Sequence, residues 1–166
     1  MQYLAESLDE RRDVRQALTT ARSVISVAVL YNTDQPYSTE QLGHGSVSIA
    51  RYAWGDDYHV VVRTRIRQLL VWLAEHAGPG LEAFSCVDDG PVQERVYAEA
   101  AGLGWIGKNT CLINPSLGSW LFLGEIVTNL DLEPDTPGVD QCGTCTKCLD
   151  ACPTGVCSPR HGRITT

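Results

Sequence analysis

Apolar residues recur along the chain with two different spacings, which predict where helices and strands form. Over residues 56–76 apolar side chains return every three or four positions, as in a helix with one buried face. An amphipathic helix is also expected over residues 3–18. Residues 23–31 and 83–87 are short and apolar and predict buried strands, and residues 119–129 predict one or two more. This mixture predicts a layered α+β or α/β fold.

The acidic pair that follows the strand at residues 83–87 marks a junction between a strand and a helix. Asp88 or Asp89 can cap a helix that begins near Pro91 and ends before Gly102. Side chains at such junctions commonly face a ligand. Asp88 is therefore a candidate site residue, with a helix cap as the alternative interpretation.

Three segments are predicted to lack regular structure. Residues 32–48 are polar and contain Gly and Pro, which indicates a surface loop. Residues 102–109, GLGWIGKN, have three glycines within six positions and predict a loop controlled by its backbone. Residues 130–141 are acidic and contain two prolines, as expected of a linker. The predicted organisation is a domain over 1–130, a linker over 131–140 and a small segment over 141–166.

Composition and charge narrow the class of protein. The chain has 166 residues, of which 43% are hydrophobic, and this is enough for one globular domain. No apolar stretch approaches the roughly 20 residues that a membrane-spanning helix needs, so we expect no membrane contact and a cytoplasmic location. The net charge of −7 repels a polyanion, so any contact with RNA has to be local.

Five of the seven cysteines crowd into the last 25 residues. The run CGTCTKCLDACP has the C-x2-C-x2-C-x3-C-P spacing of bacterial ferredoxins, in which thiolates hold a cubane iron–sulfur cluster. Zinc is the alternative, but a zinc site needs a distant second pair of ligands. The expected metal ligands are Cys142, Cys145, Cys148 and Cys152.

The last cysteine of this run limits how many clusters the chain can hold. In two-cluster ferredoxins the fourth cysteine ligates the other cluster. Beyond Cys152 only Cys157 remains as a further thiol, which is too few for two clusters. We therefore expect at most one four-iron cluster.

Four motifs, in order along the chain, resemble those of epoxyqueuosine reductases. They are RYAWGDDYH at residues 51–59, VDDGPVQERVYAEAAGLGWIGKN at 87–109, GSWLFLGEI at 118–126 and CGTCTKCLDACPTG at 142–155. The resemblance covers residues 1 to about 159 and suggests a sequence cut short at both ends. It implies an α+β fold with a nitroreductase-like cobalamin-binding sandwich, followed by a partial ferredoxin-like 4Fe-4S domain.

The resemblance also implies an oxidoreductase activity and its participants. Cobalamin, reduced through 4Fe-4S clusters, would convert the epoxide of epoxyqueuosine in a tRNA anticodon loop to an alkene. An external electron donor would be a second partner. The aspartate of the V-D-x-x-P motif, here Asp88, would donate a proton to the departing oxygen.

The remaining site residues follow from the same motifs. Arg95 would line the substrate site or orient Asp88, whereas its alternative is a surface charge on an amphipathic helix. The glycine loop that ends at Lys108 would allow close approach of a bulky tetrapyrrole. The residues expected near cobalamin or substrate are Arg51, Tyr52, Asp57, Tyr58, His59, Arg95, Lys108 and Asn109.

Three other functions are compatible with parts of the sequence. A corrinoid reductive dehalogenase shares cobalamin and two clusters but usually carries an export signal and a tyrosine acid. An electron-transfer module of ferredoxin type would explain the cysteines and leave the roughly 140 preceding residues without a role. A gene fragment without activity of its own is the third alternative.

Overall fold

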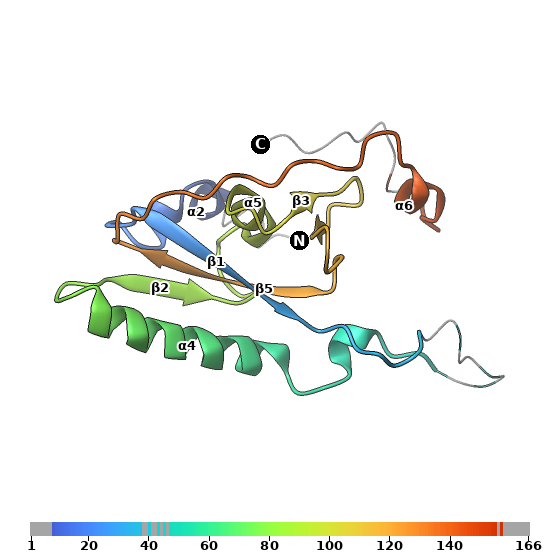
Figure 1. The fold of residues 1–166 in the computed structure, drawn as a ribbon, viewed down its shortest axis with the longest axis horizontal. Coiled ribbons are helices and arrows are strands. Elements are labelled where there is room, and N and C mark those ends of the chain that lie inside the picture. The colour runs from blue at the N-terminus through green and yellow to red at the C-terminus, as the bar shows by residue number, and fades with distance from the viewer. Residues whose placement is uncertain are drawn as a thin grey trace.

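A three-stranded antiparallel sheet forms the centre of the described chain (Figure 1). The computed structural model describes residues 8–37, 40, 43, 45, 47–155 and 157. The strand order is β1-β5-β2, where β1 spans Ser23–Leu30, β5 spans Leu121–Thr128 and β2 spans Ala83–Cys86. Both outer strands pair antiparallel with β5. All three predicted strand regions are confirmed, and residues 119–129 contribute one strand.

A long helix covers one face of this sheet. Helix α4 spans Tyr58–His76 and runs along the sheet in Figure 1, which confirms the helix predicted over residues 56–76. Val62 and Ile66 of α4 are buried with Ile126 of β5. At Gly124 a Cβ atom would lie 2.8 Å from Ile66 Cδ1, so a larger residue there would push the helix off the sheet.

The opposite face is covered by short elements. Helix α5 spans Glu94–Ala100, and α2 and the 3-10 helix η1 span Leu8–Arg12 and Val14–Gln16. The predicted helix over residues 3–18 is wrong in its continuity, because Asp13 interrupts it. The Asp13 side chain accepts a hydrogen bond of 2.9 Å from the backbone N–H of Arg15 and so caps η1. The first part of the prediction, residues 3–7, lies outside the described residues.

The glycine-rich segment forms part of a small hairpin. Strands β3 and β4 span Trp105–Ile106 and Leu112–Ile113 and pair antiparallel, so the prediction of an irregular loop over 102–109 is wrong at residues 105–106. The glycines allow backbones to pack directly. A Cβ at Gly104 would lie 2.3 Å from the Ile113 carbonyl oxygen, which only glycine avoids.

Residues 130–141 run back across α5 toward the cysteine segment (Figure 1). The Gly138 N–H donates a hydrogen bond of 2.9 Å to the Glu99 carbonyl oxygen at the end of α5. A Cβ at Gly138 would lie 1.7 Å from the Gly104 carbonyl oxygen. This linker has no helix or strand, as predicted, and it is mostly exposed, with its close contact to the hairpin at Gly138. It leads to the short helix α6, Lys147–Asp150.

The described chain therefore combines helices with an antiparallel sheet, as expected of an α+β fold. Each face of the sheet has its own buried cluster, one under α4 and one under α5. None of the helices in the described residues has the length and apolar character needed to span a membrane.

Candidate active site

The candidate site lies at the end of β2, next to the first turn of α4. Asp88 follows buried Val87 and adopts a left-handed backbone with φ of 58°. Helix α5 begins only at Glu94, with Gln93 in the cap position and no side-chain cap. The prediction that Asp88 or Asp89 caps a helix near Pro91 is therefore wrong. A short turn separates the acidic pair from the helix, and both carboxylates are available for other contacts.

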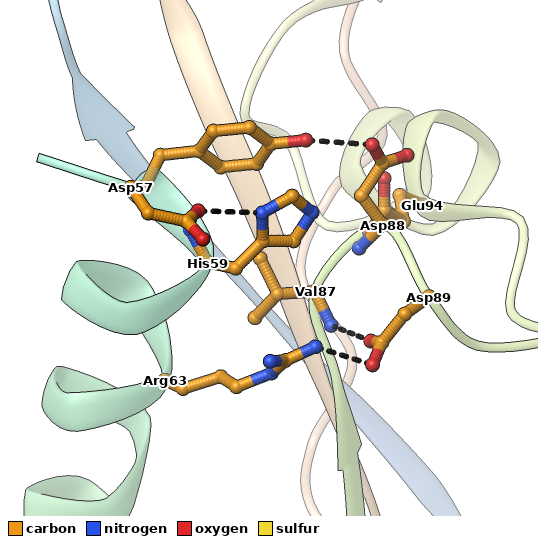
Figure 2. Close-up of polar contacts among 8 residues, drawn as sticks. Asp57, His59, Arg63, Val87, Asp88, Asp89 and Glu94 are labelled. Atoms are coloured by element: carbon orange, nitrogen blue, oxygen red, sulfur yellow. Dashed lines mark hydrogen bonds and ion pairs between the residues drawn. The ribbon is translucent and has the colours of Figure 1, made fainter.

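Hydrogen bonds anchor this turn, which we call the Asp88 loop (residues 87–90), on both sides (Figure 2). The Asp88 N–H donates to Glu94 Oε1 at 2.6 Å. Asp89 Oδ1 accepts from the Val87 N–H at 3.0 Å, and the other Asp89 oxygen pairs with the Arg63 guanidinium of α4. Asp89 thus closes the turn, whereas the Asp88 carboxylate points toward Tyr58.

Tyr58 positions the Asp88 side chain. Its hydroxyl donates a hydrogen bond of 2.6 Å to Asp88 Oδ2. Its ring stacks on Phe122 of β5, with centroids 4.3 Å apart, and on His59, with centroids 4.0 Å apart. Partial burial, together with the hydrogen bond to Asp88, raises the pKa of the Tyr58 phenol. The phenol therefore stays protonated near neutral pH and acts as a donor.

Asp57 caps the N-terminus of α4 and orients the imidazole of His59. Its Oδ1 accepts from the His59 N–H at 2.9 Å and lies 2.7 Å from His59 Nδ1 (Figure 2). The hydrogen bonds from His59 lower the pKa of the Asp57 carboxyl. One residue thus caps the helix and fixes a ring that stacks on Tyr58.

Arg51, predicted to lie near cobalamin or substrate, is buried in a clamp that holds the preceding loop. Its guanidinium donates to the Gln35 carbonyl oxygen at 2.7 Å and to the Asn32 side chain. It also lies over the rings of Trp54 and Trp120, at 4.9 and 5.3 Å from their centroids. Arg51 thus holds the loop that precedes it and does not line the cavity described below.

A shallow cavity of about 300 Å³ opens beside these residues. It is lined by Tyr52, Ala53, Gly55, Asp56, Asp57, Tyr58 and His59. Four of the predicted site residues therefore share one open surface, which carries the rings of Tyr52, Tyr58 and His59 and which we call the aromatic surface. Asp88 contacts it through Tyr58.

The other predicted site residues lie around the hairpin. Arg95 donates to the Thr110 carbonyl and hydroxyl oxygens. Asn109 Oδ1 accepts from the Cys111 N–H at 3.2 Å.

Lys108 connects the hairpin to the cysteine segment. Its Nζ donates to the Gly143 and Cys145 carbonyl oxygens at 2.7 and 2.9 Å.

The cysteine segment holds free thiols near this junction. The Trp105 indole N–H donates to Cys142 Sγ at 3.4 Å. Hydrogen bonds from the Cys157 backbone and from Thr154 lower the pKa of Cys152 to about 6. Within the described residues no three His, Cys, Asp or Glu side chains are gathered as a metal site. The ligand set inferred from spacing remains a prediction.

Sequence reasoning missed two residues that contact the Asp88 loop, Arg63 and Glu94, and the buried Glu125 of the central strand. Glu125 of β5 is fully buried, and burial raises the pKa of its carboxyl to about 9. The signal for Glu125 was its position as one acidic residue inside the apolar run WLFLGEIV. Glu94 gave no comparable signal, because acidic residues are common in the first turn of a helix.

Comparisons with known proteins agree on one family. Residues 11–89 match the family model described as epoxyqueuosine reductase QueG, DUF1730. The epoxyqueuosine reductase of Gloeobacter violaceus is 54% identical over 144 residues, which are 87% of this chain and 44% of that protein. The chain spans about half the length of the curated relatives it matches.

Solved structures lead to the same family. A crystal structure of epoxyqueuosine reductase with a tRNA-Tyr epoxyqueuosine-modified stem loop has a TM-score of 0.78 and 38% identity, covering 90% of this chain and 40% of that one. The Bacillus subtilis enzyme, solved with its catalytic loop swung out of the active site, has a TM-score of 0.77 and 37% identity, with the same coverage.

The matched proteins are oxidoreductases with the same mixed helix-and-sheet fold. This chain belongs to the epoxyqueuosine reductase family.

Proposed function

We propose that this chain carries the proton-donating site of an epoxyqueuosine reductase, with Asp88 as the acid. The observation that carries the proposal is the placement of Asp88. Its exposed carboxylate is oriented by Tyr58 at the edge of an open aromatic surface. Tyr58 binds Oδ2 of this carboxylate, and among the described residues none hydrogen-bonds the other oxygen, Oδ1. Oδ1 can therefore carry a proton toward a bound substrate.

The substrate we propose is epoxyqueuosine in the anticodon loop of tRNA. The support is the tRNA stem loop in the crystal structure of a relative that is 38% identical. We also propose that the Asp88 loop corresponds to the catalytic loop that is swung out in the B. subtilis structure. An external electron donor completes the set of partners.

The residues of the aromatic surface fit a cobalamin. Tyr58 and His59 present stacked rings beside an open cavity, and Tyr52 is exposed at its edge. Exposed rings beside an open cavity offer contact area to a corrin ring. The finer architecture that follows is a nitroreductase-like cobalamin domain with a partial ferredoxin-like segment.

The donor set of the cysteine segment fits one iron–sulfur cluster. Cys142, Cys145 and Cys148 are free thiols at the spacing of a cubane site, and none is fully buried. The Trp105 N–H at Cys142 Sγ is a hydrogen bond of the kind that tunes such clusters. When bound, cobalamin and the cluster would supply the two electrons of the reduction.

The protein side chains manage the protons. Reduction of the epoxide to an alkene breaks both carbon–oxygen bonds, takes up two electrons and two protons, and releases the oxygen as water. Asp88 would deliver a proton to the departing oxygen, which avoids expulsion of an alkoxide or hydroxide. Tyr58 keeps the carboxyl directed at the open surface. Asp57 and His59 form part of the aromatic surface that the substrate would contact.

Asp88→Asn tests this role in the holoenzyme. Asparagine keeps the size of the side chain and accepts from Tyr58 but cannot deliver a proton, so single-turnover reduction of epoxyqueuosine tRNA should fall roughly 100-fold or more. Cobalamin binding should stay near the parental value.

Asp89→Asn is the matched control. It retains the oxygen that accepts from the Val87 N–H and loses only a solvent-exposed ion pair with Arg63, so it should cost little. Parental turnover by Asp88→Asn together with slow turnover by Asp89→Asn would move the acid to Asp89.

A further inference from the structure

Lys108 lies between β3 and β4, and its side chain reaches the cysteine segment. Its Nζ donates hydrogen bonds to the carbonyl oxygens of Gly143 and Cys145, at 2.7 and 2.9 Å. These two carbonyl groups stand on either side of Thr144, within the first C-x2-C step of the cysteine run. One ammonium group thus contacts two peptide groups of the loop that carries the expected cluster ligands.

The backbone that carries Lys108 is itself fixed. The Gly107 carbonyl oxygen accepts from the Thr110 N–H at 2.8 Å, which closes a tight turn around Lys108. Thr110 has a φ of 66°, a left-handed conformation that a non-glycine residue adopts only where its surroundings hold it. Arg95 of α5 supplies such a contact by donating to the Thr110 carbonyl oxygen. Lys108 therefore projects from a turn that is anchored to α5.

The loop that Lys108 contacts is a tight turn over residues 142–145. The Cys145 N–H donates to the Cys142 carbonyl oxygen at 2.9 Å, and Gly143 has a φ of 45°. The turn types that begin with a positive φ differ in the direction of their central peptide group. Here the central peptide joins Gly143 to Thr144, and its carbonyl oxygen is one of the two that Lys108 binds. Lys108 therefore selects one of the two directions.

The direction of each carbonyl group also sets the direction of the amide that follows it. In a trans peptide the C=O and N–H groups point in opposite directions, and the described peptide bonds are trans. The N–H groups of Thr144 and Thr146 therefore point away from Lys108. Neither donates a hydrogen bond to another described residue. Backbone N–H groups presented together in a turn bind anions, including iron–sulfur clusters.

We propose that Lys108 is a positioning residue of the iron–sulfur site. It holds the Gly143 and Cys145 carbonyl groups on one side of the loop. The amides of Thr144 and Thr146 are then left to donate to the cluster sulfides. Such donors and a nearby positive charge stabilise the more negative, reduced cluster, so both raise its reduction potential. The effect on the potential rests on the proposed cluster, whereas the effect on the order of the loop does not.

Nitrogen-15 relaxation of the chain without iron tests the effect on the loop. Lys108→Gln removes the ammonium group, so the order parameters of the Thr144 and Cys145 amides should fall below the parental values, to less than about 0.6. Lys108→Arg keeps a charged donor and should retain the parental order. The Val127 amide of β5 serves as the folding control. Equal order parameters in the parental chain and Lys108→Gln would overturn the proposal.

A redox titration of the anaerobically reconstituted chain, followed by electron paramagnetic resonance, tests the effect on the cluster. At a fixed potential Lys108→Gln should raise the ratio of oxidised to reduced cluster at least about tenfold, which is about 59 mV for one electron. Lys147→Gln is the control, because it removes an equal charge between Cys145 and Cys148 and keeps both hydrogen bonds from Lys108. Equal shifts in the two variants, or none in Lys108→Gln, would refute the positioning role. A parental chain that takes up no iron would instead contradict the proposed cluster, and the order parameters would then decide whether Lys108 holds the loop.

Discussion

The Asp88 loop and the cysteine segment differ in how the rest of the protein holds them. The loop follows a strand of the central sheet and is bound by α4 through Arg63 and by α5 through Glu94. The cysteine segment contacts the hairpin through Trp105 and Lys108, and its described part contains one helix of four residues. Asp88 is thus positioned by contacts with two helices. The cysteine segment is attached to the hairpin mainly through its backbone carbonyl groups, which Lys108 binds. Such weak attachment is typical of segments whose order depends on a bound metal.

The first test concerns iron binding by the cysteine segment, where one substitution should abolish binding completely. After anaerobic reconstitution the chain should bind at most one cluster of about four iron atoms, and Cys145→Ala should abolish uptake, because the motif needs its three thiolates. Cys86→Ala is the control: burial raises the pKa of that thiol to about 12, so it supplies no thiolate. Iron analysis measures the result. About eight iron atoms per chain, or stoichiometric zinc without iron, would be inconsistent with one cluster.

The second test compares stability in the two regions. Ile126 is fully buried between the sheet and α4, so Ile126→Ala should lower the free energy of unfolding by about 2–5 kcal/mol. Leu149→Ala in α6 should cost less than about 1 kcal/mol, because this short helix contributes no residue to either buried cluster. Urea denaturation followed by circular dichroism measures both values. Equal losses would show that the cysteine segment is part of the cooperative fold.

The smallest expected effect concerns the contact between Tyr58 and Asp88. Tyr58→Phe keeps the stacking on Phe122 and removes the hydrogen bond of 2.6 Å, which should cost about 1 kcal/mol. Tyr52→Phe, at a ring that is 53% exposed, should change stability little. Thermal unfolding of both variants makes the comparison. If the two variants lost equal stability, Tyr58 would hold the loop by stacking alone.

The parts of the fold that depend on local periodicity could be predicted from the sequence. Helix α4 and the strands β1, β2 and β5 follow from apolar spacing, which tertiary contacts do not override here. The break between α2 and η1 at Asp13 could not be predicted from that spacing. The apolar pattern continues on both sides of Asp13, although this residue caps a new helical turn. Residues 105–106 were also predicted to be loop, since their pairing with β4 depends on partners eight and six residues away.

The candidate site could be predicted only in part, for a related reason. The motif at residues 51–59 includes Asp57, Tyr58 and His59, which the structure brings to one surface. The contact of Tyr58 with Asp88 joins segments 30 residues apart, and no local pattern encodes it. The burial of Glu125 was not predicted, because one acidic residue in an apolar strand breaks the pattern on which the strand prediction rests.

The alternation of β5 has a consequence for how this family can change over time. Phe122 lies on the face toward α4, where it supports the Tyr58 ring, and Glu125 lies on the face toward α5, beside Cys86. One inserted or deleted residue between them would put both side chains on the same face. Related genes should therefore keep the number of codons between these two positions constant, even where the surrounding loops vary in length.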